Sequence, residues 1–333
     1  MVDVGPQIVN RRRKPLSENA RVIAGVFLLC AVLQGCATVM PQTTELRDRW
    51  PSDVPEQVEI ADAPFFPQRD YECGPAALAT ALAHFKIPVT ADDLVSQVYI
   101  PARKGSVQAE MLAAPRRYGM VSYALAPRFD DLLREVADGT PVVVLQNYGA
   151  GPFQFWHYAT AVGYDAHVGS LTMRSGTWRR WWMPLAMFEY TWKKSAYWAM
   201  IVMPPERIPA TADPARYLQA IVALEQAGQP RAAATAYTTY LKRWPDEIGA
   251  SVGLANAHYA LGELAQTERV LRQALEKHPE SVIAMNNLAQ TLSDAGRGTE
   301  ALEVIDRAAA APGAYEKAVQ QTRASILERL GRR

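Results

Sequence analysis

The C-terminal third of the chain repeats itself every 34 residues. Glycine recurs at this interval at Gly228, Gly262 and Gly296, and proline recurs at Pro245 and Pro279. Small and apolar residues keep the same phase at several further positions of this segment. A period of this length is typical of stacked supersecondary units, and glycine permits the tight turn that joins two helices. We therefore predict pairs of helices that bury their apolar faces by packing against neighbouring pairs.

This period, with small residues at the expected helix crossings, resembles the tetratricopeptide repeat. The resemblance covers three units over 214–313, and the rest of the segment 214–333 is predicted to add a capping helix. His258 and Thr267 depart from the usual pattern, since they replace an apolar and a small residue. The resemblance implies a concave surface for a peptide or protein partner; the alternative is an appendage that only stabilises or dimerises the chain. Three prolines within 204–213 predict a linker before the first unit.

The other end of the chain has the pattern of an export signal. A cluster of lysine and arginine over 11–21 is followed by 12 apolar residues, 22–33. A transmembrane helix needs roughly 20 apolar residues, so this run fits the core of a signal peptide, and an uncleaved membrane anchor is the alternative. The run ends in the tetrapeptide LQGC at 33–36, which resembles the lipobox of bacterial lipoproteins.

The lipobox resemblance implies cleavage of a signal peptide, residues 1–35, and attachment of lipid to Cys36. Ala37, in place of an aspartate after this cysteine, implies sorting to the outer membrane of the bacterial envelope, facing the periplasm. Several acyl chains hold a protein firmly at a membrane, whereas a single chain binds only marginally. We therefore expect contact with the membrane through Cys36, followed by a polar tether over 36–60.

Cysteine usage leaves one free thiol in the mature chain. Cys30 belongs to the signal and Cys36 would carry lipid, so Cys73 remains alone in an oxidising compartment. Cys73 precedes an Ala- and Leu-rich stretch, 76–83, that favours a helix, and Pro75 suits its first turn. We therefore expect Cys73 at a helix N-terminus, where the helix dipole lowers the thiol pKa and favours the nucleophilic thiolate. A buried structural cysteine is the alternative.

A histidine lies at the start of one of three predicted strands. The strands cover 141–147, 157–165 and 170–175, and His157 opens the second. A side chain at the start of a sheet strand can face a helix N-terminus across a cleft. The thiol of Cys73 and the imidazole of His157 can therefore meet, although 84 positions separate them in the sequence.

Two motifs of this region carry a resemblance to a known family. Residues 68–75 read Q-x4-C-G-P before a helix, and residues 157–165 read HYATAVGYD. Together they resemble the bacteriocin-processing, double-glycine-leader cysteine peptidases and their stand-alone relatives. The resemblance implies a papain-like α+β fold over 61–203, in which an N-terminal helix packs on an antiparallel sheet. It also implies hydrolysis of a peptide bond in a peptide or protein substrate.

The same resemblance implies the roles of three side chains. Cys73 would be the nucleophile, and His157 would take its proton and later protonate the leaving amine. Gln68 matches the oxyanion-hole glutamine, which with the backbone N–H of Cys73 would stabilise the tetrahedral intermediate. An ordinary loop glutamine and a strand-end histidine without chemistry are the alternatives.

The third catalytic position departs from the family pattern. The family usually has an aspartate, followed by proline, at the end of the strand after the histidine strand, whereas this chain reads MRSG over 173–176. We expect Ser175 to orient the imidazole weakly; Asn147 is another candidate, and Asp165 lies too far away. The departure leaves open a Cys–His pair with a weak orienter or a catalytically degenerate peptide-binding adaptor. A cell-wall amidase or acyltransferase using the same pair is a third reading.

Composition and motifs exclude other classes of protein. Lys and Arg number 35 against 34 Asp and Glu, so there is no surplus of positive charge to neutralise nucleic-acid phosphates. The sequence has no G-x-x-x-x-G-K-[ST] motif and no His, Cys or Asp spacing typical of a metal site, so we expect no nucleotide, metal or other cofactor.

Aromatic residues concentrate over 153–198. We expect them mainly in the core and at a domain contact, and a wall that contacts the substrate is the alternative.

Overall fold

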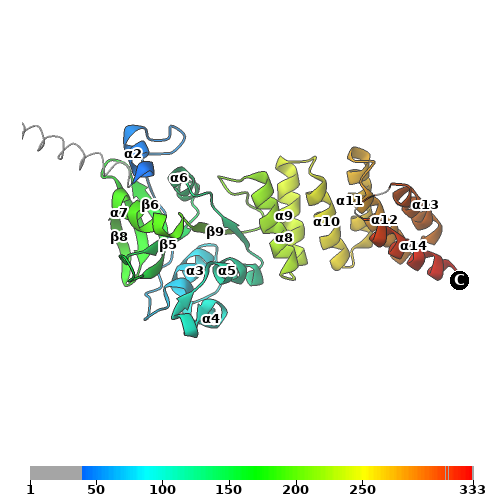
Figure 1. The fold of residues 1–333 in the computed structure, drawn as a ribbon. Coiled ribbons are helices and arrows are strands. Elements are labelled where there is room, and N and C mark those ends of the chain that lie inside the picture. The colour runs from blue at the N-terminus through cyan, green and yellow to red at the C-terminus, as the bar shows by residue number, and fades with distance from the viewer. Residues whose placement is uncertain (1–39, 312, 314, 332–333) are drawn as a thin grey trace, which may run out of the picture. The chain divides into compact units, whose positions relative to one another are not determined.

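Residues 40–311, 313 and 315–331 are described by the computed structural model shown in Figure 1. The expected signal peptide and the expected lipidation site at Cys36 lie outside these residues. Within the described ranges, no helix combines the length and the apolar character that crossing a membrane requires.

The chain divides into two compact units, residues 1–49 and 50–333. Where the first unit is described, it forms helix α2 (Pro41–Asp48). The second unit begins within the expected tether, because β1 (Gln57–Glu59) pairs with the long strand β6 (Trp156–Asp165). The tether is therefore shorter than predicted, since backbone hydrogen bonds tie its last residues to a sheet.

An antiparallel sheet of seven strands organises the α+β domain, as expected. Its order is β4-β9-β5-β6-β7-β8, and β1 pairs with the second half of β6. The three predicted strands are β5, β6 and β7, and β5 and β7 are buried along their whole length. The remaining bounds are β4 (Val121–Ala124), β5 (Val142–Asn147), β7 (Ser170–Ser175), β8 (Trp178–Pro184) and β9 (Ala199–Met203).

Helices and short elements flank this sheet. Figure 1 shows three helices grouped beside the strands, namely α3 (Cys73–His84), α4 (Ala91–Val98) and α5 (Gln108–Ala113). The short elements of this group are β2 (Tyr99–Ile100), η1 (Pro101–Arg103), β3 (Gly105–Ser106) and η2 (Ala114–Tyr118). The domain is completed by α6 (Phe129–Ala137), α7 (Leu185–Trp192) and η3 (Lys193–Ser195).

The main core of this domain lies between α3 and the sheet. The alanine and leucine side chains over most of α3 are buried, as expected of a helix that is apolar on nearly every side. They pack against buried side chains of β5 and β9. A hydrogen bond of 3.2 Å from Thr160 Oγ1 of β6 to Ala77 O links α3 directly to β6. The two elements that carry Cys73 and His157 are therefore fixed against each other.

Paired helices follow the sheet domain, as the 34-residue period predicts. The pairs and the final helix are α8 (Pro214–Gln226) with α9 (Pro230–Arg243), α10 (Ile248–Ala260) with α11 (Leu264–Lys277), α12 (Val282–Asp294) with α13 (Gly298–Ala309), and then α14 (Glu316–Gly331). Gly228, Gly262 and Gly296 lie in the turn within each pair, with φ of +75°, +76° and +80°. Glycine adopts this left-handed conformation without the steric cost of a side chain, so the period reflects a recurring backbone requirement.

The two residues that depart from the repeat pattern share one polar partner. His258 Nδ1 lies 2.7 Å from Glu263 Oε2, across the turn between α10 and α11. Thr267 Oγ1 donates to Glu263 O at 3.1 Å, one turn earlier in the chain. Hydrogen bonds to Glu263 therefore accommodate both polar side chains where apolar or small residues are usual.

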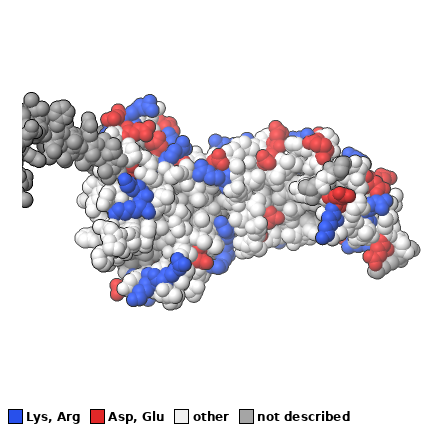
Figure 2. Space-filling view, in the orientation of Figure 1, with Lys and Arg blue, Asp and Glu red and all other residues white. Residues whose placement is uncertain are grey.

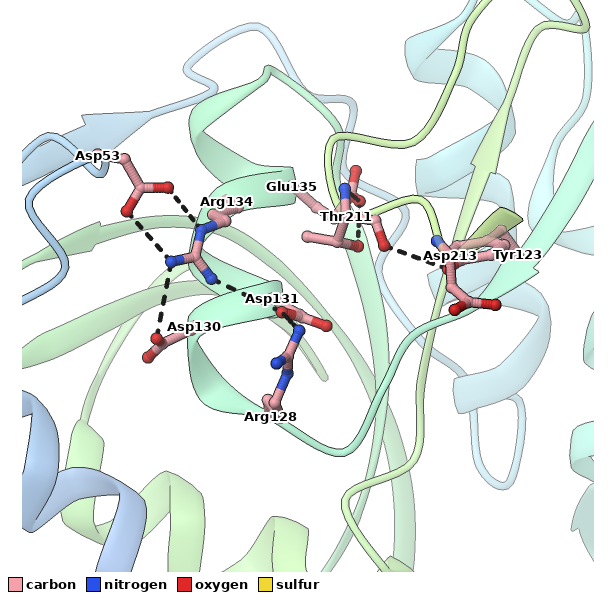
Figure 3. Close-up of polar contacts among 9 residues, drawn as sticks. All are labelled: Asp53, Tyr123, Arg128, Asp130, Asp131, Arg134, Glu135, Thr211 and Asp213. Carbon is pink, nitrogen blue, oxygen red and sulfur yellow. Dashed lines mark hydrogen bonds and ion pairs between the residues drawn. The ribbon is translucent and has the colours of Figure 1, made fainter. Parts of the chain in front are cut away.

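The segment between β9 and α8, predicted as a linker, is hydrogen-bonded to the sheet domain (Figure 3). The buried carboxylate of Glu135 on α6 accepts from the backbone N–H of Ala210 and from both the N–H and the hydroxyl of Thr211. The hydroxyl of Tyr123 on β4 donates to Thr211 O at 3.2 Å and accepts from Asp213 N at 3.0 Å. The Asp213 side chain in turn caps α8, so the first repeat helix is anchored to the sheet domain.

Replacing Tyr123 tests this anchor. Tyr123→Phe keeps the buried ring but leaves Thr211 O and Asp213 N without their partner. We expect the free energy of unfolding to fall by about 1–3 kcal/mol and amide hydrogen exchange over 211–213 to become faster. Tyr315→Phe, at an exposed tyrosine, is the matched control. Equal effects of the two substitutions would contradict the anchoring role.

Candidate active site

An open cleft of about 1290 Å³ lies between the start of α3 and the strands β6, β7 and β8. Its other walls come from the hairpin of β2 and β3, the loop after β5, and η3. Cys73, His157, Gln68 and Ser175 all line this cleft. The tertiary structure therefore brings together the four side chains that the sequence indicated.

Cys73 is the first residue of α3, as predicted. Burial raises the pKa of the Cys73 thiol above its ordinary value, although hydrogen bonds from the backbone N–H groups of Tyr158 and Gly74 lower it. The expectation of a lowered thiol pKa is therefore wrong for the resting protein, because desolvation outweighs the helix N-terminus and the amide donors. The contact with Tyr158 nevertheless places the sulfur beside the residue that follows His157.

Gly74 allows α3 to begin close to the hairpin of β2 and β3. A Cβ atom at this position would overlap the side chain of Ser106 and lie 3.2 Å from Met111 Sδ. A larger residue would displace either the hairpin or the first turn of α3, which carries Cys73. The glycine after the cysteine therefore has a steric basis, in addition to any chemical role of its neighbours.

His157 is partly buried near the start of β6, where the strand register places it opposite Gln146 of β5. Its Nε2 shares a hydrogen bond of 2.8 Å with Ser175 Oγ. The ring of Tyr148 lies against the imidazole, with ring centroids 5.5 Å apart. Burial lowers the pKa of His157 from 6.5 to about 4, so the imidazole is uncharged near neutral pH.

Ser175, at the buried end of β7, is the side-chain partner of His157, whereas the other candidates point elsewhere. Asn147 Oδ1 accepts from two backbone N–H groups of the loop after β5 and so fixes that loop. Asp165 lies at the opposite end of β6 and accepts backbone N–H groups of the following turn. Among the described side chains, no carboxylate is hydrogen-bonded to the His157 ring.

Gln68 is held from both its backbone and its side chain. Its backbone N–H donates to Gly176 O at 3.1 Å, next to Ser175, and its Nε2 donates to Tyr158 O at 3.3 Å. A carboxamide nitrogen carries two N–H groups, so one fixes the side chain and the other can serve a ligand in the cleft. Because Tyr158 contacts both Gln68 and the Cys73 sulfur, the carboxamide and the thiol share one neighbour.

Arg174 has a structural role at the site that the sequence analysis did not assign. Its buried guanidinium donates to the carbonyl oxygens of Ala61, Ala63 and Arg179. These bonds hold the segment before α3 and the strand β8 to the end of β7, where Ser175 lies. A single charged residue in a predicted strand that is otherwise uncharged is the signal that could have indicated this role, because a buried charge needs hydrogen-bond partners.

The aromatic residues of the segment 153–198 divide between the core and the cleft. Trp192 is fully buried, as expected. Trp156 and Trp178 instead line the cleft and are 48% and 66% exposed, and Trp181 lines the same wall. The expectation of a core position is wrong for these three. Trp178 and Trp181 belong to β8, the last strand of the sheet, whose side chains gain less cover than those of a central strand, and Trp156 begins β6 at its cleft end.

The chemical groups of the cleft are a thiol, an uncharged imidazole with a hydroxyl partner, and a carboxamide donor. Within the described ranges, no three His, Cys, Asp or Glu side chains cluster in a way that could hold a metal ion. His84, at the last position of α3, hydrogen-bonds through Nε2 to Gly139 O at 3.0 Å. The arrangement is therefore suited to nucleophilic attack by sulfur with proton transfer to nitrogen.

Several solved structures are similar to parts of the chain, while no curated protein matches the sequence. A putative C39-like peptidase from Bacillus anthracis is 17% identical with a TM-score of 0.37, over 45% of this chain and 98% of that chain. The peptidase domain of Streptococcus ComA, a bifunctional ABC transporter of a quorum-sensing pathway, is 18% identical with a TM-score of 0.34, over 43% and 98%. A thermophilic tetratricopeptide-repeat protein of Thermus thermophilus is 21% identical with a TM-score of 0.34, over 36% and 66%.

Two protein families match the chain directly, each over one of its parts. The Peptidase_C39 like family matches residues 60–200, which include the sheet and the cleft. The tetratricopeptide repeat matches residues 217–266 and 252–315, which include the helix pairs. The chain therefore carries a Peptidase_C39-like domain followed by tetratricopeptide repeats.

Proposed function

We propose that the chain is a cysteine peptidase that hydrolyses a peptide bond through Cys73 and His157. The observation that carries this proposal is the shared cleft, which the thiol, the imidazole and the Gln68 carboxamide all line. The cleft is open to solvent and large enough for several residues of an extended polypeptide. The match to the Peptidase_C39 like family supports amide hydrolysis as the reaction class.

The reaction would start from an uncharged pair. With the ring proton of His157 on Nε2 and donated to Ser175 Oγ, Nδ1 holds the lone pair that takes the proton of the Cys73 thiol. The sulfur then bonds to the scissile carbonyl carbon, and the carbonyl oxygen becomes an oxyanion that Gln68 Nε2 and the Cys73 backbone N–H stabilise. As the C–N bond breaks, His157 gives its proton to the leaving amine. A water molecule deprotonated by the same imidazole then hydrolyses the thioester.

The lack of a carboxylate sets the reactivity of this pair. Proton transfer would create an imidazolium whose side-chain partner, Ser175, is an uncharged hydroxyl. Burial opposes the transfer at both ends, because it raises the pKa of Cys73 and lowers that of His157. The resting thiolate fraction is therefore small, and turnover would be slower than with an aspartate in place of Ser175.

The same observation favours a second candidate, a peptide-binding adaptor. If the proton cannot leave the thiol at a useful rate, the cleft still offers exposed aromatic walls and the donor group of Gln68 to a bound peptide. Such an adaptor would share the fold and the binding cleft with a peptidase and would lack only the chemical step. Reactivity of the Cys73 thiol therefore separates the two candidates.

We further propose that the repeats recruit a protein substrate or partner and that lipid on Cys36 holds the chain in the bacterial envelope. Paired helices in series present an extended surface that suits a peptide or protein ligand. The support for the anchor is the lipobox-like tetrapeptide after an apolar run that is too short to span a bilayer.

Thiol alkylation as a function of pH tests the Cys–His pair. Labelling of Cys73 by iodoacetamide should rise with pH and show an apparent pKa above that of an ordinary cysteine, because burial disfavours the thiolate. Ser175→Asp should increase labelling at neutral pH by about tenfold or more, since a carboxylate would stabilise the imidazolium that forms when the thiol loses its proton. His157→Ala should abolish the increase in labelling that Ser175→Asp produces. It should also abolish peptide cleavage, which is read by mass spectrometry.

Thr177→Asp is the matched control for this experiment. Thr177 is exposed on the turn after β7 and lines the same cleft. An aspartate at this position adds the same charge to the cleft as Ser175→Asp but leaves Ser175, the partner of His157, in place. Slow labelling that neither His157→Ala nor Ser175→Asp changes would identify the adaptor instead. Digestion of muropeptides rather than peptides would identify a cell-wall amidase.

Fatty-acid labelling in bacterial cells tests the anchor. We expect an alkyne-tagged fatty acid to label the wild-type chain, which should fractionate with the membranes. Cys36→Ser should lose both the label and the membrane fractionation, because no other cysteine of the sequence lies in a lipobox-like tetrapeptide. Cys73→Ser is the control and should keep both. Label that persists on Cys36→Ser would overturn the proposal of lipidation at this residue.

A further inference from the structure

The cleft carries an excess of positive charge that the whole chain does not have. Its charged lining residues are four cations, Arg69, Arg103, Lys104 and Lys194, and one carboxylate, Asp70. In the whole sequence, 35 Lys and Arg face 34 Asp and Glu. On the face drawn in Figure 2, Lys and Arg side chains form separate groups over the sheet domain, with uncharged surface between them. Cations are therefore concentrated where a substrate would bind.

Three of these four cations are not offset by an ion pair within the described ranges. Arg69 pairs with Asp92 at 3.3 Å, which offsets its charge. Lys104 Nζ lies 5.6 Å from the centre of the Tyr71 ring, and Lys194 Nζ donates to Gly149 O at 2.8 Å. A carbonyl or a ring face positions an ammonium group without cancelling its charge. Arg103, Lys104 and Lys194 outnumber Asp70, the one carboxylate of the lining, so the cleft keeps a net positive charge.

The positive groups come from more than one wall of the cleft. Arg103 and Lys104 belong to the turn between β2 and β3, which lies against the first turn of α3 through the Gly74–Ser106 contact. Lys194 belongs to η3, which follows α7 on the sheet side. A ligand that spans the cleft would therefore meet cations at more than one position along its length.

Exposed aromatic side chains accompany these cations. Tyr71 and Phe155 line the cleft and are 55% and 61% exposed, and Trp156 and Trp178 are exposed on the same lining. Large apolar side chains that gather at an open cleft are typical of a surface that a ligand covers. Aromatic rings beside cations suit a ligand that alternates apolar groups with negative charges.

We propose that the cleft selects a peptide in which acidic side chains flank an apolar or aromatic stretch. The proposal deepens the proposed peptidase function and rests on it for the cleavage step, but binding itself requires only the cleft. Charge complementarity distinguishes this peptide from a basic one, which the field of Arg103, Lys104 and Lys194 would repel. The aromatic lining distinguishes it from a wholly acidic polar segment, which would leave that lining exposed.

Binding to the uncleaving variant tests the proposal. Full-length Cys73→Ala is titrated with a fluorescein-labelled peptide that alternates glutamate with leucine and phenylalanine, and binding is read by fluorescence anisotropy. We expect the matching glutamine peptide to bind about tenfold more weakly and the lysine peptide more weakly still. Raising the salt from about 0.05 M to about 0.5 M should remove most of the difference between the glutamate and glutamine peptides. Equal affinity for the three peptides would overturn the proposal.

A matched pair of double substitutions locates the effect. Arg103→Gln with Lys104→Gln removes two exposed cations of the cleft and should weaken binding of the glutamate peptide by about fivefold to tenfold, with little effect on the glutamine peptide. Lys242→Gln with Arg307→Gln removes two exposed cations of the repeats and should change neither. Equal losses in the two double variants would overturn the proposal. Vesicles of anionic lipid that displace the peptide through Arg103 and Lys104 would overturn it in favour of a membrane surface.

Cleavage assays separate this proposal from the proposed function. If wild type binds the glutamate peptide selectively but cuts none of the peptides, the charge preference stands and the peptidase proposal fails. If wild type instead cuts all three peptides at the same rate, while His157→Ala cuts none of them, the peptidase proposal stands and the charge preference fails. Selective cleavage of the glutamate peptide that Arg103→Gln with Lys104→Gln reduces would support both.

Discussion

The whole site depends on the close packing of the start of α3 against β6. The backbone of Tyr158 lies close enough to the Cys73 thiol to lower its pKa, and Thr160, two residues further along β6, donates to Ala77 in the next turn of the helix. Gln68 reaches the carbonyl of the same Tyr158. The Cys73 thiol and the Gln68 carboxamide are thus positioned beside backbone groups of the strand that carries His157. Donors that are already in place at rest need no reorganisation during the reaction.

Close packing also removes water, and this has an electrostatic consequence. Burial raises the pKa of Cys73 and lowers that of His157, so both groups are uncharged near neutral pH. A carboxylate beside the imidazole would offset this desolvation, whereas Ser175 contributes a neutral oxygen. An acidic peptide in the cleft would bring the negative charge that the chain itself does not place beside His157.

The connection to the repeats is anchored rather than free. Glu135 and Tyr123 of the sheet domain bind the backbone of the connecting segment. Asp213, the last residue of this segment, caps the first turn of α8 with its side chain. A flexible connection of the same length would allow the repeats to move independently of the sheet domain. A partner held by the repeats would therefore be confined in its position relative to the sheet domain, which raises its effective concentration there.

Local sequence signals determined the elements and the identity of the candidate site residues. The glycine period predicted the helix pairs, the residues after Cys73 predicted α3, and the missing aspartate pointed to Ser175 as the partner of His157. These signals are local because turns, helix starts and strand ends depend on residues close in sequence. Tertiary structure alone decided that Cys73 has a raised pKa, that residues 57–59 complete a sheet, and that Trp156, Trp178 and Trp181 line the cleft. Desolvation, edge pairing and exposure depend on groups far apart in the chain, which no local pattern reports.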